Sequence, residues 1–197
     1  VQTCALPIYP HPLDFDVQTC RNRFAPLLEK AAARGLTPVV SAERLCGNPH
    51  SGGYDSKEIA DRLRQVFPEG RILIVLREQK SMIASTYKQY IRAGGACSLD
   101  RYLHPPERGR SRIPLFDFDH FNYDRLIGYY DRLFGKDRVH VALYEDFCAD
   151  PRAFAEQIVR FGGVDLSPEQ IDALPYDVQR NAALAGTAVA VKRRLNK

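Results

Sequence analysis

Residues 71–92, RILIVLREQKSMIASTYKQYIR, constrain the fold more than any other segment of this chain. Residues 72–76 are a run of branched apolar side chains, which suits a strand covered on both faces in a parallel sheet. A helix is predicted directly afterwards, because apolar residues recur every three to four positions, at Met82, Ile83, Tyr87, Tyr90 and Ile91. A buried strand that leads into an amphipathic helix indicates an α/β fold.

The same alternation of strands and helices continues along the chain. We expect strands over residues 37–42, 71–76 and 138–143, and helices over residues 22–34, 56–67, 80–92, 99–103, 121–134 and from 151 onward. This order predicts a parallel sheet with helices on both faces. The Pro- and Arg-rich segment 104–119 is long for a loop in a compact domain, which favours a functional role for it.

A candidate anion site follows the strand at residues 71–76. Open α/β sheets bind ligands at the carboxyl ends of their strands, and Arg77 comes at that end. The guanidinium is always charged and presents a planar fork of donors, which suits a phosphate group. Ser85 lies eight residues later, with Ser81 one helical turn before it on the same face. The sequence therefore predicts a small anion pocket formed by Arg77, Ser81 and Ser85.

Several segments resemble bacterial sulfotransferase-domain proteins, in the same order and over residues 36–197: LREQKSMIASTYKQYIRAGG with SLDRYL, FDFDHFNYDRLIGYYDRLFG, VHVALYEDFCADP and RNAALAGTAVAVKRRLNK. The resemblance implies a P-loop NTPase-like sulfotransferase fold. In that family an Arg at a strand end and a Ser eight residues later hold the 3'-phosphate of 3'-phosphoadenosine 5'-phosphosulfate, the sulfate donor. Carried onto this chain, the resemblance implies that Arg77 and Ser85 bind the donor as a cosubstrate, that Glu145 anchors a loop, and that no metal takes part.

The chain departs from the family in one respect. Sulfotransferases open with a strand and a glycine-rich loop that ends in Lys followed by Ser or Thr, which holds the 5'-phosphosulfate. Here only Lys80 precedes such a residue, and it lacks the glycines; SGGYDSK (51–57) reads instead as a polar loop with Ser56 capping the next helix. We therefore expect the first strand and the P-loop to be missing, which would leave the sheet with an exposed apolar edge.

The first twenty residues differ in character from the rest. VQTC occurs at residues 1–4 and again at 17–20, with three prolines between the two copies. This pattern predicts a non-native or disordered lead over residues 1–20 and a single, incomplete sulfotransferase domain over residues 21–197, as in an N-terminally truncated fragment. A genuine short proline-rich arm is the alternative interpretation.

Charge and cysteine content limit the classes of partner and compartment. Residues 77–112 hold eight basic and three acidic residues, which favours a multiply charged donor, while the net charge of +4 is low for a nucleic-acid-binding protein. The five cysteines lack metal-ligand spacing and a disulfide pattern, and no apolar run approaches the roughly 20 residues of a membrane span. We expect a cytoplasmic protein without a membrane span, a nucleic-acid partner or a bound metal.

Sulfuryl transfer also needs a base that takes the proton from the attacking hydroxyl or amine. Glu43 is the candidate, because it follows the expected strand at 37–42 and because many sulfotransferases that act on carbohydrate or protein use a Glu. A Glu at a helix start or in a loop, paired with Arg44 or another cation, is the competing interpretation. His50 and His104, in segments that could reach the same crevice, are further candidates for the base.

The sequence thus predicts transfer of a sulfuryl group from 3'-phosphoadenosine 5'-phosphosulfate to a hydroxyl or amine acceptor, of carbohydrate type. Without the loop lysine, charge on the leaving phosphate would not be neutralised, so this chain itself is expected to be inactive. Two alternatives stay open. One is a non-catalytic nucleotide-binding or regulatory remnant, and the other is a P-loop kinase-like phosphotransferase that uses ATP.

Overall fold

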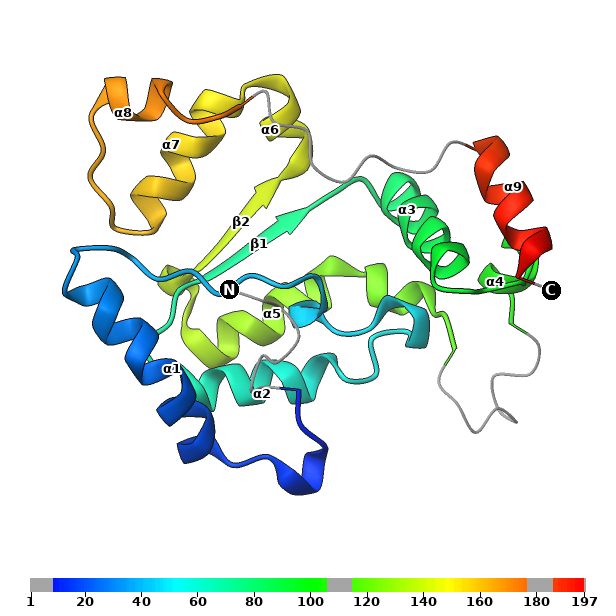
Figure 1. The fold of residues 1–197 in the computed structure, drawn as a ribbon, viewed down its shortest axis with the longest axis horizontal. Coiled ribbons are helices and arrows are strands. Elements are labelled where there is room, and N and C mark those ends of the chain that lie inside the picture. Colours follow the sequence, from blue (N-terminus) through cyan, green and yellow to red (C-terminus); the bar gives the residue numbers. More distant parts are fainter. Residues whose placement is uncertain (1–8, 106–114, 177–185, 197) are drawn as a thin grey trace.

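The computed structural model describes residues 9–105, 115–176 and 186–196, with the side chains of 186 and 187 left out (Figure 1). Its sheet consists, within these residues, of β1 (Ile72–Leu76) and β2 (Val139–Leu143). The two strands are parallel, in a register that runs from Ile72 opposite Val139 to Leu76 opposite Leu143. The carboxyl ends of both strands therefore meet at one edge of the sheet, as the sequence predicted for the site.

The predicted strand over residues 37–42 is wrong. These residues link helix α1 (Val17–Ala32) to the short 3-10 helix η3 (Glu43–Cys46) and pair with no other segment. Pro38 has no N–H to donate to a ladder. Of the two valines in this segment, Val39 has a side chain that is 78% exposed, and Val40 packs against the core.

One face of the sheet is covered by three helices, α1, α2 (Ser56–Val66) and α5 (Tyr123–Phe134), which lie together in Figure 1. Helix α5 contacts both strands, and α2 packs against α1 and α5. Their buried residues form one cluster that takes in the inward side chains of both strands: Cys20, Phe24, Ile59, Ala60, Leu63, Val66, Tyr130 and Phe134, with Ile72, Ile74 and Val139 against them. This cluster is the main core and fixes the orientation of the sheet.

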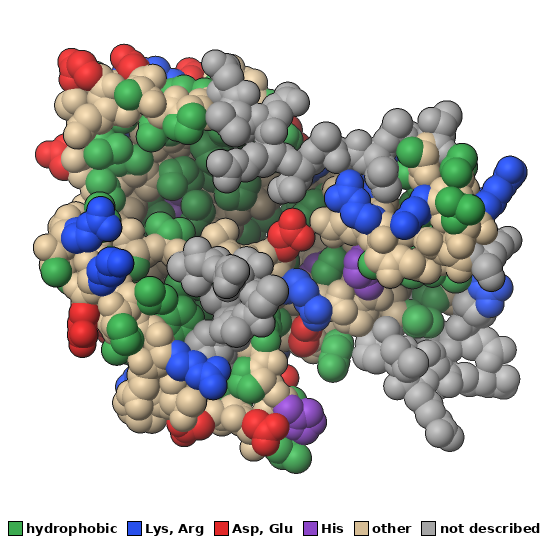
Figure 2. All heavy atoms as spheres, in the orientation of Figure 1, with side chains coloured by type: hydrophobic (Ala, Val, Ile, Leu, Met, Phe, Trp, Pro, Cys, Tyr) green, Lys and Arg blue, Asp and Glu red, His purple; other side chains and the backbone are tan. Residues whose placement is uncertain are grey.

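The opposite face carries α6 (Tyr144–Ala149), α7 (Pro151–Phe161) and α8 (Pro168–Asp172), beside β2. The ring of His140 lies against Phe161 of α7, with 5.0 Å between ring centroids. On β1 the outward residues Leu73 and Val75 are 41% and 47% exposed. Apolar side chains gather in a hollow on this side of the molecule (Figure 2). The molecule is therefore α/β with helices on both faces, and the outer face of β1 is open.

A second cluster surrounds α3 (Gln79–Arg92), the helix that follows β1. It joins α3 to α4 (Leu99–Leu103), to the 3-10 helix η5 (Phe118–Phe121) and to α9 (Gly186–Leu195), through Tyr87, Ile91, Tyr102, Phe116 and Phe121, with Val189 packed against them. Just after α9, the Asn196 amide donates to the carbonyls of Ile91 and Gly95 at the end of α3, at 2.8 and 2.9 Å. Helix α3 is thus held along its length and at its carboxyl end.

The N-terminal residues that the structure describes pack on α2. The Arg62 guanidinium donates to the Pro10 carbonyl at 2.9 Å and lies 4.4 Å from the centre of the Phe15 ring. Helix α1 begins at Val17, is capped by Asp16, and buries Cys20 in the main core. The structure therefore carries α1 across the sequence-predicted boundary at residue 20, and the division into a lead and a domain stays a prediction.

Candidate anion-binding site

The turn after β1 is fixed by contacts to its backbone from two other elements. The Tyr123 hydroxyl, on α5, donates to the Arg77 carbonyl at 2.9 Å. The Glu78 N–H donates to the Glu145 carboxylate, directly after β2, at 3.0 Å. The expectation that Glu145 anchors a loop is confirmed. These bonds hold Arg77 at the carboxyl edge of the sheet from both sides.

The Arg77 guanidinium lies over an aromatic ring instead of against a carboxylate. Its central carbon is 5.0 Å from the centre of the Tyr144 ring. Its Nε is buried and has no hydrogen-bond partner among the described residues, none of whose carboxylates forms an ion pair with this side chain. A buried donor without a partner is costly, so an acceptor arriving at this position would be stabilising.

The first turn of α3 is occupied by its own cap. The Glu78 carboxylate accepts hydrogen bonds from the backbone N–H groups of Lys80 and Ser81, at 2.9 and 2.7 Å. The Ser81 hydroxyl donates to the Glu78 carbonyl at 2.9 Å. The backbone bonds from Ser81 and then Lys80 lower the pKa of the Glu78 carboxyl. The pocket predicted from both serines therefore needs correction, because the Ser81 hydroxyl and these N–H groups are already engaged.

Ser85 lies one turn after Ser81 on the same face of α3 and is half-buried. Its hydroxyl makes no hydrogen bond within the described part of the chain. The neighbouring Thr86 differs, since its hydroxyl donates back to the Met82 carbonyl at 3.0 Å. Arg77 and Ser85 are therefore the two side chains of the predicted site that keep donors available for a ligand.

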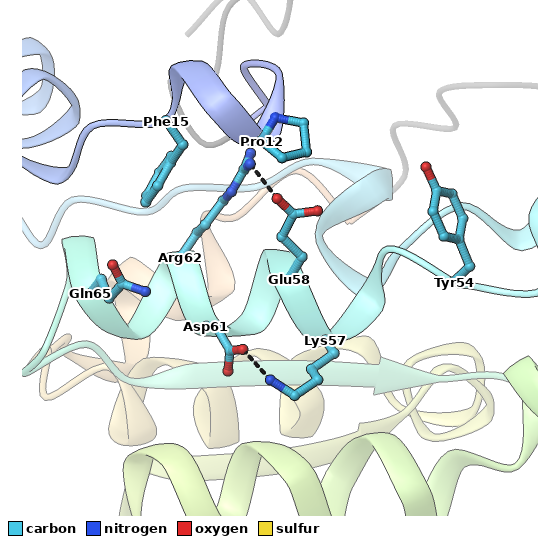
Figure 3. Close-up of a pocket in the computed structure, with 8 residues that line it drawn as sticks. All are labelled: Pro12, Phe15, Tyr54, Lys57, Glu58, Asp61, Arg62 and Gln65. Carbon is cyan, nitrogen blue, oxygen red and sulfur yellow. Dashed lines mark hydrogen bonds and ion pairs between the residues drawn. The ribbon is translucent and has the colours of Figure 1, made fainter.

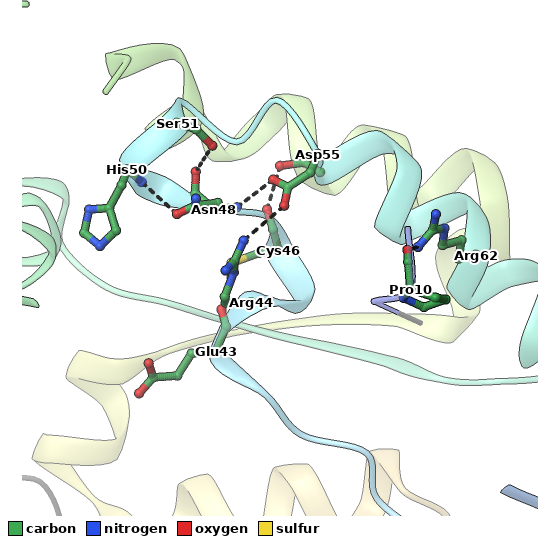
Figure 4. A network of polar contacts seen from close by, with 10 residues as sticks. Pro10, Glu43, Arg44, Cys46, Asn48, His50, Ser51, Asp55 and Arg62 are labelled. Atoms are coloured by element: carbon green, nitrogen blue, oxygen red, sulfur yellow. Dashed lines mark hydrogen bonds and ion pairs between the residues drawn. The ribbon is translucent and has the colours of Figure 1, made fainter. Parts of the chain in front are cut away.

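Glu43 is the first residue of η3 and is exposed to solvent. The competing interpretation holds in part: Glu43 does stand at the start of a helix, but it makes no ion pair within the described residues, where Arg44 pairs with Asp55 at 3.5 Å. Figure 4 shows the Glu43 side chain pointing away from the polar network around Asn48 and Asp55. The strand that was expected to position Glu43 is absent, so the catalytic role of this residue stays a prediction.

With this geometry established, comparison with known proteins is decisive for the family. A sequence model described as "Sulfotransferase family" matches residues 19–168, which is more than half of the chain. The chain belongs to the sulfotransferase family. The predicted family is confirmed, and the match covers residues 36–168 of the segment in which the resemblance was read.

A solved structure of a family member is also similar. The sulfotransferase from Alicyclobacillus acidocaldarius is 22% identical, with a TM-score of 0.49, over 64% of this chain and 51% of that chain. This chain thus spans about half the length of that sulfotransferase. A search of curated proteins found no match.

The two histidines predicted as alternative bases, His50 and His104, lie in different surroundings. The Nδ1 of His50 lies 2.8 Å from the Tyr102 hydroxyl, and burial, followed by the charge of Arg44, lowers the pKa of His50. The exposed His104 ends α4, with its Nδ1 3.3 Å from the Asp100 carboxylate. Each imidazole therefore already uses one ring nitrogen in a local contact.

A cavity of about 400 Å³ lies along the outer side of α2 (Figure 3). Its lining includes neither Arg77 nor Ser85 nor Glu43. Its charged side chains are paired with each other, Lys57 with Asp61 and Arg62 with Glu58. The cavity is therefore a gap beside the packed N-terminal residues, separate from the predicted anion site.

Among the described residues, no three His, Cys, Asp or Glu side chains are grouped as metal ligands would be. Across the same residues, no helix has the length and apolar character needed to cross a membrane.

Proposed function

We propose that Arg77 and Ser85 bind the 3'-phosphate of 3'-phosphoadenosine 5'-phosphosulfate in a sulfuryl transfer to a hydroxyl or amine acceptor of carbohydrate type. The observation that carries this proposal is the environment of the Arg77 side chain. Its guanidinium is held at the carboxyl edge of the sheet, its Nε is buried without a partner, and no described carboxylate neutralises it. A phosphate group would supply both the missing acceptor and the opposite charge.

In this proposal Arg77 and Ser85 position the donor and take no part in the chemistry. The acceptor oxygen or nitrogen attacks sulfur in line, the bond between sulfur and the 5'-phosphate oxygen breaks, and adenosine 3',5'-bisphosphate leaves. Glu43 takes the acceptor's proton. The exposed Glu43 carboxylate, which points away from its neighbours, is free to do so.

The negative charge that develops on the leaving phosphate needs a cation or oriented N–H groups. The 197 residues contain no glycine-rich loop that ends in Lys followed by Ser or Thr, and the first N–H groups of α3 are taken by Glu78. We therefore propose that this chain by itself binds the donor nucleotide but transfers its sulfuryl group slowly or not at all.

Nucleotide preference tests the binding half of the proposal. The chain is titrated calorimetrically with adenosine 3',5'-bisphosphate, adenosine 5'-monophosphate and ATP. We expect the bisphosphate to bind at least about tenfold more tightly than the monophosphate, since charge-assisted contacts contribute about 1.5–3 kcal/mol each. A preference for ATP would contradict the proposal and favour the kinase-like alternative.

Turnover tests the catalytic half. Radiolabelled donor is incubated with the chain and a panel of carbohydrate and amine acceptors, and we expect no transfer above the rate without protein. In any longer form of the protein that is active, Glu43→Gln should lower kcat by about 10²–10⁴-fold and leave bisphosphate affinity unchanged. Transfer by the present chain would contradict its proposed inactivity. An active form whose kcat is unchanged by Glu43→Gln would contradict the role of Glu43 as the base.

A further inference from the structure

Tyr144 is the counterpart of Arg77 at the end of the neighbouring strand. The register of the sheet ends with Leu76 opposite Leu143, so Arg77 and Tyr144 are the residues that directly follow the two strands. Tyr144 is also the first residue of helix α6, so both positions lie just beyond the paired strand ends. The sheet itself therefore brings these two side chains together.

The contact between them is of the cation–π type. The guanidinium carbon of Arg77 is 5.0 Å from the centre of the Tyr144 ring, within the range of a cation–π interaction. The next residue, Glu145, accepts the backbone N–H of Glu78. Two consecutive residues after β2 thus hold the turn after β1, one through its backbone and one through the arginine side chain.

A cation–π contact differs from an ion pair in what it asks of the guanidinium. The ring attracts the positive charge but offers no carboxylate oxygen to accept hydrogen bonds from the N–H donors. A carboxylate partner would occupy those donors and cancel the charge. An aromatic partner restricts the side chain and leaves both donors and charge for an incoming anion.

We infer that Tyr144 is a positioning residue for phosphate binding, which holds the Arg77 guanidinium in its binding orientation before the ligand arrives. The inference rests on the proposed function of Arg77. Its physical basis is preorganisation, because a long side chain that is already ordered loses less conformational freedom on binding. Tyr144 acts through Arg77, so its effect should disappear when Arg77 is removed.

A double-mutant cycle with adenosine 3',5'-bisphosphate tests the inference. Tyr144→Phe keeps the ring and should bind within about twofold of the parent chain. Tyr144→Leu removes the ring and should bind about three- to fivefold more weakly, the range of an exposed cation–π contact. In the Arg77→Ala background the same Leu substitution should change affinity by less than about twofold. Tyr54→Leu, at a tyrosine that is 72% exposed on the loop before α2, is the control.

Each result bears on one of the two proposals. Unchanged affinity in Tyr144→Leu, equal losses in the Phe and Leu variants, or an undiminished loss in the Arg77→Ala background would overturn the role of Tyr144 and leave the anion site standing. A folded parent chain that does not bind the bisphosphate would overturn the proposed function, and this inference with it. If the Leu variant does not fold, Tyr144→Gln removes the ring with a polar side chain and is judged by the same criteria.

Discussion

At the scale of single residues, two glycines in left-handed conformations differ in what surrounds them. Gly53, in the loop before α2, has φ of +66°, and a Cβ built there would lie 2.2 Å from the Nδ1 of His120. Gly35, after α1, has φ of +62° with no atom within 4 Å of such a Cβ. The SGG stretch of the sequence is therefore a close-packed turn against the segment that contains His120.

This difference predicts unequal costs of substitution. Gly35→Ala should lower the free energy of unfolding by about 1–2 kcal/mol, the cost of left-handed backbone alone. Gly53→Ala should lower the free energy of unfolding by about 1–3 kcal/mol more than Gly35→Ala does, because the His120 ring must also move within a packed site. Urea denaturation of both variants measures the two losses. Equal losses would show that the close approach to His120 has no energetic weight.

The residues of the anion site were predictable from sequence only in part. Arg77 and Ser85 could be proposed because their spacing after a buried strand is visible in the sequence. The engagement of Ser81 by Glu78 was missed, although a carboxylate directly before a helix is a signal for a cap. Tyr144 was missed as a contact of Arg77, because the register between strands separated by more than 60 residues is not written in either strand.

At the scale of elements, the first turn of helix α3 is stabilised by its cap, Glu78. The Glu78 carboxylate binds two N–H groups of the first turn, and the pKa of Glu78 is lowered by those bonds. A carboxyl whose pKa is lower in the folded state stabilises that state above the unfolded pKa, and the stabilisation is lost as the pH falls through the folded value. The cap should therefore weaken in acid.

The expected outcome concerns Glu78→Gln, which retains an acceptor oxygen and removes the charge. The variant should be less stable than the parent above pH of about 4.5, and the difference should shrink as the pH is lowered further. Urea midpoints measured between pH 6 and pH 3 give this difference directly. Glu29→Gln, on the exposed side of α1, is the matched control. A difference that stays constant over the whole range would contradict the assigned cap.

Elements with strong local signals were predicted well, and an element that needed a partner was not. The amphipathic spacing of α3 and the glycine after α5 set their bounds close to the observed Gln79–Arg92 and Tyr123–Phe134. Residues 37–42 contain two valines that favour a strand, yet no neighbouring strand lies beside them in the described chain. Strand formation depends on a pairing partner, and a local pattern cannot supply one.

At the scale of the whole molecule, two packed regions meet at the turn after β1. The main core fixes the sheet on α1, α2 and α5, while the second cluster fixes α3 against α4 and α9. Arg77 belongs to the turn after the sheet, and Ser85 belongs to α3. The arrangement of the proposed anion site therefore depends on both regions being folded. The alternation of strands and helices in the sequence predicted the sheet, but it did not predict that two separate clusters position Arg77 and Ser85.

The most direct test of this site is the affinity of the Arg77→Ala variant for adenosine 3',5'-bisphosphate, measured by calorimetric titration. Arg23→Ala, which removes one exposed positive charge on α1, controls for net charge. We expect Arg77→Ala to weaken binding at least about tenfold and Arg23→Ala to leave it within about twofold, because Arg77 belongs to the proposed phosphate site and Arg23 does not. Equal affinity of the parent chain and Arg77→Ala would contradict the assignment of the anion site.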